Sequence, residues 1–274
     1  MTASAGMYAI PTRRRQRAGA RAERFWAWVE PVLVWSPAGL LLIPLLFLAI
    51  GSFTARWDSR GLSGLSLDAY ATIWSTAQGE IGFSLLLAIG VSTINLLLGV
   101  PLGVRLAQGG RRGQVLVKAI VSMPIVLPPM IVAMGLVLAW PRLIGSWEIL
   151  MLAHLVWTFP FVVWPVMTAM MALDAPTLAA AARTLGASEW AIFTRVIVPN
   201  LRNAILLAWS MTFIMSFAEI NGSLFLASAG SHPVGVGLLE SFLNLEIRVA
   251  AAYTVLFLLV LTPVFLLTVR RGAK

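Results

Sequence analysis

Residues 174–199, with the sequence DAPTLAAAARTLGASEWAIFTRVIVP, form a patterned polar segment between two strongly apolar stretches. Pro176 is typical of the first turn of a helix, and a run of alanines continues the helix from there. Gly186 stands where this helix would end, because glycine readily adopts the positive φ of a helix terminus. Ser188 can then cap a second helix that ends near the final proline. The segment therefore predicts a helix–turn–helix with its tip at residues 185–188.

The rest of the chain is too apolar for a soluble protein. Of its 274 residues, 59% are hydrophobic and only 11% are charged, whereas soluble domains carry about 25% charged residues. The mean hydropathy is +0.88. A helix needs about 20 apolar residues to cross a bilayer, and six stretches are long enough: 32–53, 82–105, 115–138, 149–172, 204–227 and 249–269. We therefore predict an all-α membrane protein with six transmembrane helices.

The distribution of positive charge predicts the topology. A net charge of +9 could indicate a nucleic-acid partner, but most Lys and Arg residues lie in alternate loops. Such loops remain cytoplasmic, so both termini and residues 174–199 are expected inside the cell, next to the lipid bilayer and not bound to nucleic acid. The residues on this side are Arg13, Arg14, Arg15, Arg17, Arg21, Arg24, Arg105, Arg111, Arg112, Lys118, Arg183, Arg195, Arg202, Arg270, Arg271 and Lys274.

The same reasoning divides the chain into regions. Residues 1–31 are expected to be a basic cytoplasmic tail and an interfacial segment, 32–270 the transmembrane domain, and 271–274 a short cytoplasmic tail. The first apolar run follows arginines, as in a signal peptide, but it is longer than the usual core of about 7–15 residues. We therefore interpret it as a retained first span. Residues 54–80 are expected to form the longest outer loop, and their Gly and Ser content suggests flexibility.

Proline and glycine indicate how the spans pack. Pro124, Pro128 and Pro129 interrupt the third stretch, either as fixed kinks or as bends that line a pathway. Gly99 and Gly103 have the spacing that lets two membrane helices approach closely, which we interpret as packing.

Chemistry-bearing residues are few. The chain has no cysteine, which excludes disulfides and thiolate metal sites. His154 is isolated in the fourth stretch, so a hydrogen-bonded interior role is favoured over metal binding. Neither a metal site nor a catalytic residue is expected.

Glu219 is the one acidic residue within the six stretches. On a continuous helix it would share a face with Ser216 and Ser223. Such a polar face either lines a translocation pathway or binds another span or a second membrane subunit structurally, because ionisable groups in lipid face a cavity or a partner. If it contacts the solute, a carboxylate favours a cationic or hydroxylated solute over an oxyanion.

The segment 174–199 resembles the EAA loop of permease subunits in binding-protein-dependent ABC importers. That family's pattern is Glu-Ala-Ala, three residues, Gly, nine residues, then Ile-x-Leu-Pro. Ala181 and Ala182 match the alanine pair, Gly186 matches the glycine, and residues 196–199 match the end with conservative changes. Ala180 departs from the pattern, because relatives carry glutamate there. Residues 225–230, FLASAG, are most similar to the polyamine, iron, thiamine and phosphonate permease group.

The resemblance implies a type I ABC importer permease fold, with transport and ATP hydrolysis carried out by different subunits. The chain has no phosphate-binding Gly-x-x-x-x-Gly-Lys-Ser/Thr loop, so it is not expected to be an enzyme, and ATP and Mg are expected in partner ATPases. The implied ATPase-coupling residues are Ala181, Ala182, Arg183, Leu185, Gly186, Ala187 and Ser188. Arg183 either pairs with an acidic partner residue or is an ordinary cytoplasmic arginine.

The implied assembly lies in the bacterial cytoplasmic (inner) membrane. It contains two ATP-binding subunits, a second permease that is related and not identical, and a periplasmic or lipid-anchored solute-binding protein. The expected substrate is a polyamine or another small polar solute. An ion-driven secondary transporter is the main alternative, although such transporters usually show an internal repeat and the sequence has no convincing one. A membrane scaffold without a transport role is a further alternative.

Overall fold

The structure is a computed structural model that describes residues 13–109 and 113–272. The beginning of the predicted basic tail, Arg111, Arg112 and the last two residues lie outside this range. The chain divides into two compact units, Met1–Ile50 and Gly51–Lys274. Most described residues are helical, in agreement with the predicted all-α class.

The first unit contains most of helix α1 (Arg13–Ser52), and the last two residues of this helix are assigned to the second unit. The part from Trp26 to Ser52 is long and apolar enough to cross a membrane, and it covers all but the last residue of the predicted stretch 32–53. Its mean hydropathy is 2.3, and side chains such as Leu40 are largely exposed. Exposed apolar side chains on a helix of this length suit a lipid environment.

The second unit begins with a hairpin where the sequence suggested a flexible loop. Strands β1 (Thr54–Asp58) and β2 (Gly61–Leu65) pair antiparallel. The tight turn forms because Gly61 adopts φ 109°, and Asp58 Oδ1 accepts a hydrogen bond of 2.8 Å from the Arg60 N–H. Helix α2 (Asp68–Ala107) starts soon afterwards, well before residue 82. The predicted loop 54–80 is therefore wrong, because local turn chemistry and early helix formation order it.

Helix α2 is the centre of the second unit and packs most extensively on α6 (Pro160–Ala172) and α10 (Arg202–Phe217). The two glycines allow α6 to approach closely. A Cβ at Gly99 would lie 2.7 Å from Val162 Cγ1, and a Cβ at Gly103 would lie 3.0 Å from the Val163 carbonyl oxygen. The packing interpretation of this glycine pair is confirmed.

The third predicted stretch is broken into two helices. Helix α3 (Gly113–Val126) and helix α4 (Pro129–Ala139) meet at 104°. Proline disfavours a helical conformation in the residue before it and removes a backbone donor, so Pro128 and Pro129 end one helix and begin the next. The predicted interruption of 115–138 is therefore present at Pro128 and Pro129, whereas Pro124 lies inside α3. A short 3₁₀ turn, η1 (Pro141–Leu143), follows α4.

The fourth stretch combines α5 (Trp147–Thr158) with α6, and together they are long enough to span a membrane. The last helix, α13 (Ile247–Gly272), also meets the length and apolarity required. Among the described residues, four helices are long enough, or up to six if each of two bent pairs counts as one span.

The fifth predicted stretch ends early. Helix α10 stops at Phe217, and residues 218–222 leave the helix before the short helix α11 (Ser223–Leu226). Gly222 is required here, because a Cβ would lie 2.8 Å from the Trp157 ring. The continuous helix predicted over 204–227 is therefore wrong, although its apolar character is right.

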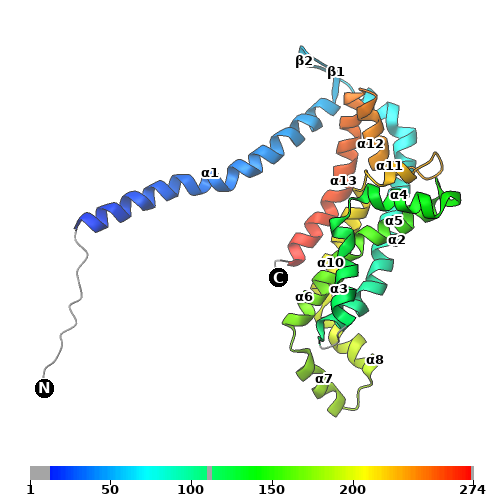
Figure 1. Ribbon diagram of the computed structural model, residues 1–274. Coiled ribbons are helices and arrows are strands. Elements are labelled where there is room, and N and C mark those ends of the chain that lie inside the picture. Colours follow the sequence, from blue (N-terminus) through cyan, green and yellow to red (C-terminus); the bar gives the residue numbers. More distant parts are fainter. Residues whose placement is uncertain (1–12, 110–112, 273–274) are drawn as a thin grey trace. The chain divides into compact units, whose positions relative to one another are not determined.

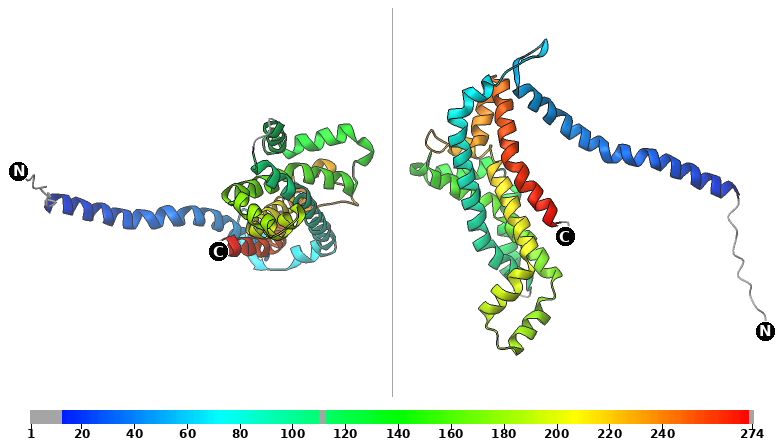
Figure 2. Two further views of the ribbon diagram at one scale, coloured as in Figure 1. Left: turned by 90° about the horizontal axis from the view of Figure 1, so that it is seen from below. Right: turned by 180° about the vertical axis from the view of Figure 1, so that it is seen from behind.

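The remaining elements lie toward the two ends of the second unit. Helix α12 (Val234–Leu243) lies at the end that carries the β hairpin. At the opposite end, helix α7 (Ala175–Thr184) and helix α8 (Glu189–Ile192) project from the helical bundle. Figure 2 shows the same arrangement from behind. The two ends can therefore contact different partners.

The close approach of α2 and α6 gives a test of the fold. We expect Gly103→Leu to lower the thermal unfolding midpoint measured in detergent, because forcing a side chain into a filled interface costs about 1–3 kcal/mol. Gly82→Leu on the same helix is the matched control, since a Cβ there meets nothing within 4 Å. Equal midpoints for the two variants would contradict this account of the packing.

Candidate functional site

Residues 174–199 form two helical pieces joined by a sharp turn. Helix α7 ends at Thr184, and Gly186 takes φ 79°, the conformation that its position in the sequence suggested. Ser188 Oγ accepts a hydrogen bond of 3.3 Å from the Ala191 N–H, which caps α8. The second piece therefore starts at a defined point, and the tip of the turn is compact.

The second helical piece contains one widened turn. After α8 comes η2 (Phe193–Ile197), a π-helical turn, and then α9 (Val198–Asn200). Pro199 lacks an N–H and crowds the carbonyl of the preceding turn, and a local π adjustment accommodates both effects. The chain then bends by 73° into α10.

The residues predicted at the tip divide into an exposed group and a group that packs inward. The Leu185 side chain is 88% exposed, and the neighbouring Trp190 is 73% exposed. Ala182 and Ala187 are half-buried and pack against a core cluster that includes Val166 and Ile192. The exposed predicted residues are Ala181, Arg183, Leu185, Gly186 and Ser188. The tip thus presents one large apolar side chain on a small, rigid turn.

Arg183 has a partner within its own segment. Its guanidinium donates to both carboxylate oxygens of Glu189, at 2.8 Å and 3.1 Å. This hydrogen bonding lowers the pKa of the Glu189 carboxyl below its usual value. The sequence analysis did not consider Glu189, although the two residues lie six apart across a predicted turn. The fork-like pair joins α7 to α8 and fixes the angle between them.

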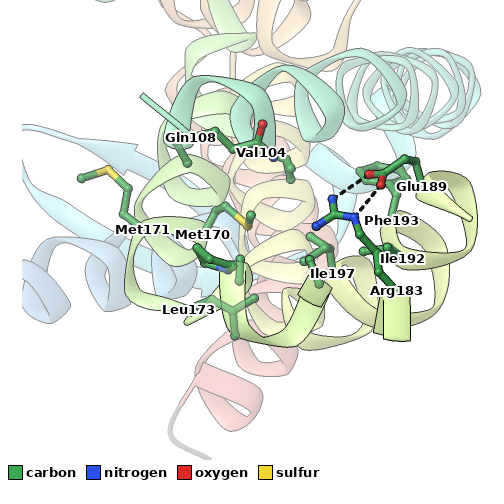
Figure 3. A pocket seen from close by; sticks show the side chains of 14 residues that line it. Val104, Gln108, Met170, Met171, Leu173, Arg183, Glu189, Ile192, Phe193 and Ile197 are labelled. Atoms are coloured by element: carbon green, nitrogen blue, oxygen red, sulfur yellow. Dashed lines mark hydrogen bonds and ion pairs between the residues drawn. The ribbon is translucent and has the colours of Figure 1, made fainter. Parts of the chain in front are cut away.

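The pair lies at the edge of an open cleft of about 480 Å³ between the helix–turn–helix and the bundle. Figure 3 shows Val104 of α2 and Gln108, directly after α2, on the other side of this cleft from Ile192 and Phe193. Mostly apolar side chains line the cleft, so the segment packs on the bundle through apolar contacts that leave part of the interface open. The segment is therefore attached to the bundle without being embedded in it.

A second cluster, of polar residues, is buried inside the bundle. It contains His154 of α5, Ser216 of α10, Glu219 of the broken segment and Ser223 of α11, each at most 8% exposed. The Glu219 carboxylate accepts three hydrogen bonds: 2.7 Å from the Gly222 N–H, 2.8 Å from the Ser223 N–H and 2.6 Å from the Ser223 hydroxyl. The carboxylate thereby satisfies the backbone donors at the start of α11.

His154 completes this cluster. Its Nε2 lies 3.0 Å from Ser223 Oγ, and its Nδ1 lies 2.8 Å from Ser216 Oγ. Because the Ser223 hydroxyl donates to Glu219, its oxygen accepts from Nε2–H, which leaves Nδ1 to accept from Ser216. The interior hydrogen-bonded role of His154 is confirmed. What the sequence analysis missed is that His154 joins the three predicted polar residues.

A turn, and not the predicted helical face, brings Ser216, Glu219 and Ser223 together. The helical periodicity that placed Ser216, Glu219 and Ser223 on one face does not exist, because α10 ends at Phe217. A turn brings the side chains together, and every carboxylate oxygen of Glu219 already has a donor. This geometry favours the structural interpretation, while a role in the translocation pathway stays a prediction.

Comparison with known proteins now has a structural context. Residues 99–270 match the family described as the inner membrane component of binding-protein-dependent transport systems. The matched region includes the helix–turn–helix and the polar cluster. The chain belongs to this family.

Relatives of this permease transport different solutes. It is 30% identical to the molybdate/tungstate transport system permease of Thermococcus kodakarensis, over 67% of this chain and 74% of the relative. It is 26% identical to the spermidine/putrescine permease of Escherichia coli, over 66% and 69%. It is 23% identical to a putative 2-aminoethylphosphonate permease of Salmonella typhimurium, over 89% and 98%. The resemblance to ABC importer permeases is confirmed, including polyamine and phosphonate members.

Solved structures support the fold of the permease. A bacterial ABC transporter involved in import of the acidic polysaccharide alginate has a chain that matches with a TM-score of 0.75 at 16% identity, covering 91% of this chain and 97% of that one. The methionine ABC transporter in an inward-facing form matches with a TM-score of 0.61 at 19% identity, covering 74% and 97%. The permease is a multi-pass membrane protein with the type I ABC permease fold.

The polar cluster of the permease gives a second prediction. Glu219→Gln is expected to lower the unfolding midpoint, because an amide places an NH₂ group against backbone and hydroxyl donors. A buried donor left without an acceptor costs about 1–3 kcal/mol. Glu246→Gln, at an exposed acid, serves as the control and should leave the midpoint unchanged. Identical midpoints would show that the three hydrogen bonds to Glu219 do not stabilise the broken segment.

Proposed function

We propose that residues 174–199 couple this permease to a partner ATPase. The observation that carries the proposal is the exposed apolar tip, with Leu185 beside Gly186, at one end of the unit and within the region that matches the permease family. A compact turn that presents a large apolar side chain can enter a groove on another protein. The Arg183–Glu189 pair supports this role by holding the tip in one shape before a partner binds.

The chemistry of ATP belongs to the partner in this proposal. Two ATP-binding subunits would hold ATP and Mg, and their closure would move a pair of docked helix–turn–helix segments. This chain is proposed to be a transport subunit without catalytic activity of its own. A related second permease would complete the solute pathway, and a periplasmic or lipid-anchored binding protein would deliver the solute.

The proposed topology has six spans, with both termini and residues 174–199 on the cytoplasmic side of the inner membrane. Four helices are long enough to span by themselves, and we propose that α3 with α4 forms one further span and that α10 forms the other. The concentration of Lys and Arg near one set of loops supports the orientation. The separation of the helix–turn–helix from the β hairpin, at opposite ends of the second unit, is consistent with one inner and one outer face.

The proposed substrate is a small polar solute, with a polyamine as one candidate. Named relatives act on molybdate or tungstate, on spermidine and putrescine, and on 2-aminoethylphosphonate. The argument for a cation from Glu219 is weak, because donors within its own turn occupy the carboxylate. Selectivity is therefore proposed to reside largely in the binding protein and in the paired permeases.

Docking at the tip is tested by Gly186→Arg. We expect this variant to lose co-purification of its partner ATPase, because a long charged side chain would project where the tip must enter a groove. Gly186→Asn is the matched control, since asparagine tolerates positive φ and adds little bulk. Retention of the ATPase by Gly186→Arg would refute the docking proposal, and failure of the unaltered chain to bind any ATPase would favour an ion-driven transporter or a scaffold.

A charge exchange tests the role of Arg183. Arg183→Glu alone is expected to reduce ATP hydrolysis by the assembled transporter, because two carboxylates then repel across the turn. The double variant Arg183→Glu with Glu189→Arg should restore most of the activity if the pair acts within the segment. If the double variant is as impaired as the single one, Arg183 instead pairs with the ATPase. Thermal unfolding should change little, since exposed ion pairs contribute about 0–1 kcal/mol.

A further inference from the structure

A polar pocket lies at the end of the second unit opposite the helix–turn–helix. It has a volume of about 530 Å³, and α2, the segment before α12 and α12 itself contribute its walls. Three ionisable side chains meet here: Glu80 of α2, His232 of the connecting segment and Glu240 of α12. The sequence analysis assigned no role to any of them. Neither the helix–turn–helix nor the hydrogen bonds of the polar cluster explain why these charged side chains converge from three elements.

His232 lies between the two carboxylates. Its Nδ1 is 2.9 Å from Glu80 Oε1, and its Nε2 is 3.3 Å from Glu240 Oε2. The Glu80 side chain is only 7% exposed, whereas the Glu240 side chain is 52% exposed. The imidazole therefore links a fixed, buried acid on one side to a solvated acid on the other.

The number of protons on the imidazole decides whether both carboxylate contacts can be hydrogen bonds. A neutral imidazole has one N–H and one nitrogen lone pair, so one carboxylate would face a lone pair. An imidazolium donates from both nitrogens and binds both carboxylates with charge-assisted hydrogen bonds. Histidine is the side chain whose ordinary charge change falls between about pH 5 and 8. The bridged geometry is thus the arrangement expected of the protonated side chain.

The surroundings hold Glu80 in place. A Cβ at Gly237 of α12 would collide with its carboxylate, and Tyr253 of α13 interacts with the same group. Nearby, the Val234 N–H donates to Ser84 Oγ at 2.9 Å, which attaches the start of α12 to α2. The acid is therefore the fixed side of the bridge. Ser228 Oγ and Ser231 Oγ each donate to the Gly145 carbonyl oxygen at 2.6 Å, which anchors the segment carrying His232 to the residues before α5. Its contact with α2 depends on the His232 bridge and on the Val234 hydrogen bond.

We propose that Glu80, His232 and Glu240 form a proton-dependent latch that holds the segment before α12 against α2, with His232 as its positioning residue. The latch is closed while the imidazole carries both protons. It releases as the pH rises, because the Glu240 contact is longer and solvated and is lost first. If the proposed topology is right, the latch lies on the outer face and responds to external pH. That location rests on the proposed function, whereas the latch itself does not.

The absence of cysteine from the chain makes a direct test possible. Nitroxide labels on Gln78→Cys in α2 and Ala229→Cys in the segment, both exposed positions, report the distance across the pocket by electron paramagnetic resonance. The full chain is measured in lipid nanodiscs at about pH 5.5 and about pH 8.5, on either side of the ordinary histidine range. We expect a narrow distance distribution at the lower pH and a broader or longer one at the higher pH.

Variants test whether His232 causes the expected pH response of the distance distribution. His232→Gln keeps one donor and cannot titrate in this range, so its distribution should be broad at both pH values. Glu240→Gln should weaken the response, and Glu148→Gln, at an exposed acid that does not line the pocket, should preserve it. An unchanged distribution in the parent chain, or a persistent pH response in His232→Gln, would overturn the latch.

ATPase co-purification, measured separately on the same labelled protein, keeps the two proposals distinguishable. A pH response without ATPase binding would support the latch and refute the coupling role. ATPase binding without a pH response would refute the latch and support the coupling role. An unfolding midpoint of His232→Gln equal to that of the parent would show that a lost response is not caused by misfolding.

Discussion

The hydrogen bonds that Glu219 accepts are the interaction on which the centre of this permease depends. In an apolar environment each backbone donor must find a partner within the protein, and a helix that stops inside the bundle exposes several donors at once. The carboxylate accepts from two backbone N–H groups and one hydroxyl directly after the break. This allows α10 to end at Phe217, and the bend positions α11 for contact with α4 and α5.

The same requirement explains where the other interruptions occur. Pro128 lies between α3 and α4, and a bend of 104° avoids the clash that a continuous helix would produce. Pro199 follows the π turn η2 and precedes the second bend, which leads into α10. By contrast, the glycine-lined contact between α2 and α6 is close and uninterrupted by a loop, so we interpret it as the rigid frame. The unit thus combines one tightly packed pair with broken helices around it.

Sequence reasoning succeeded where local chemistry determines structure. Gly186 and Ser188 each need only their own neighbours to adopt a turn and a cap, and both behave as predicted. It failed where contacts between distant segments decide the outcome. The meeting of His154 with Ser216 and Ser223 joins residues more than 60 apart, and hydrophobic periodicity carries no information about such a meeting. The β hairpin was missed because glycine and serine were interpreted as flexibility.

Three charged side chains at the sites described above have partners within the chain itself. Glu219 is bound by its own turn, Glu80 by His232, and Arg183 by Glu189. Burying a charge without a partner is costly, so the buried acids need partners from the chain itself. Relatives of the chain are named for an oxyanion and for polyamines, which are solutes of opposite charge. Because the donors of its own turn occupy the Glu219 carboxylate, this buried acid offers no free charge that would favour one of these solute classes over the other.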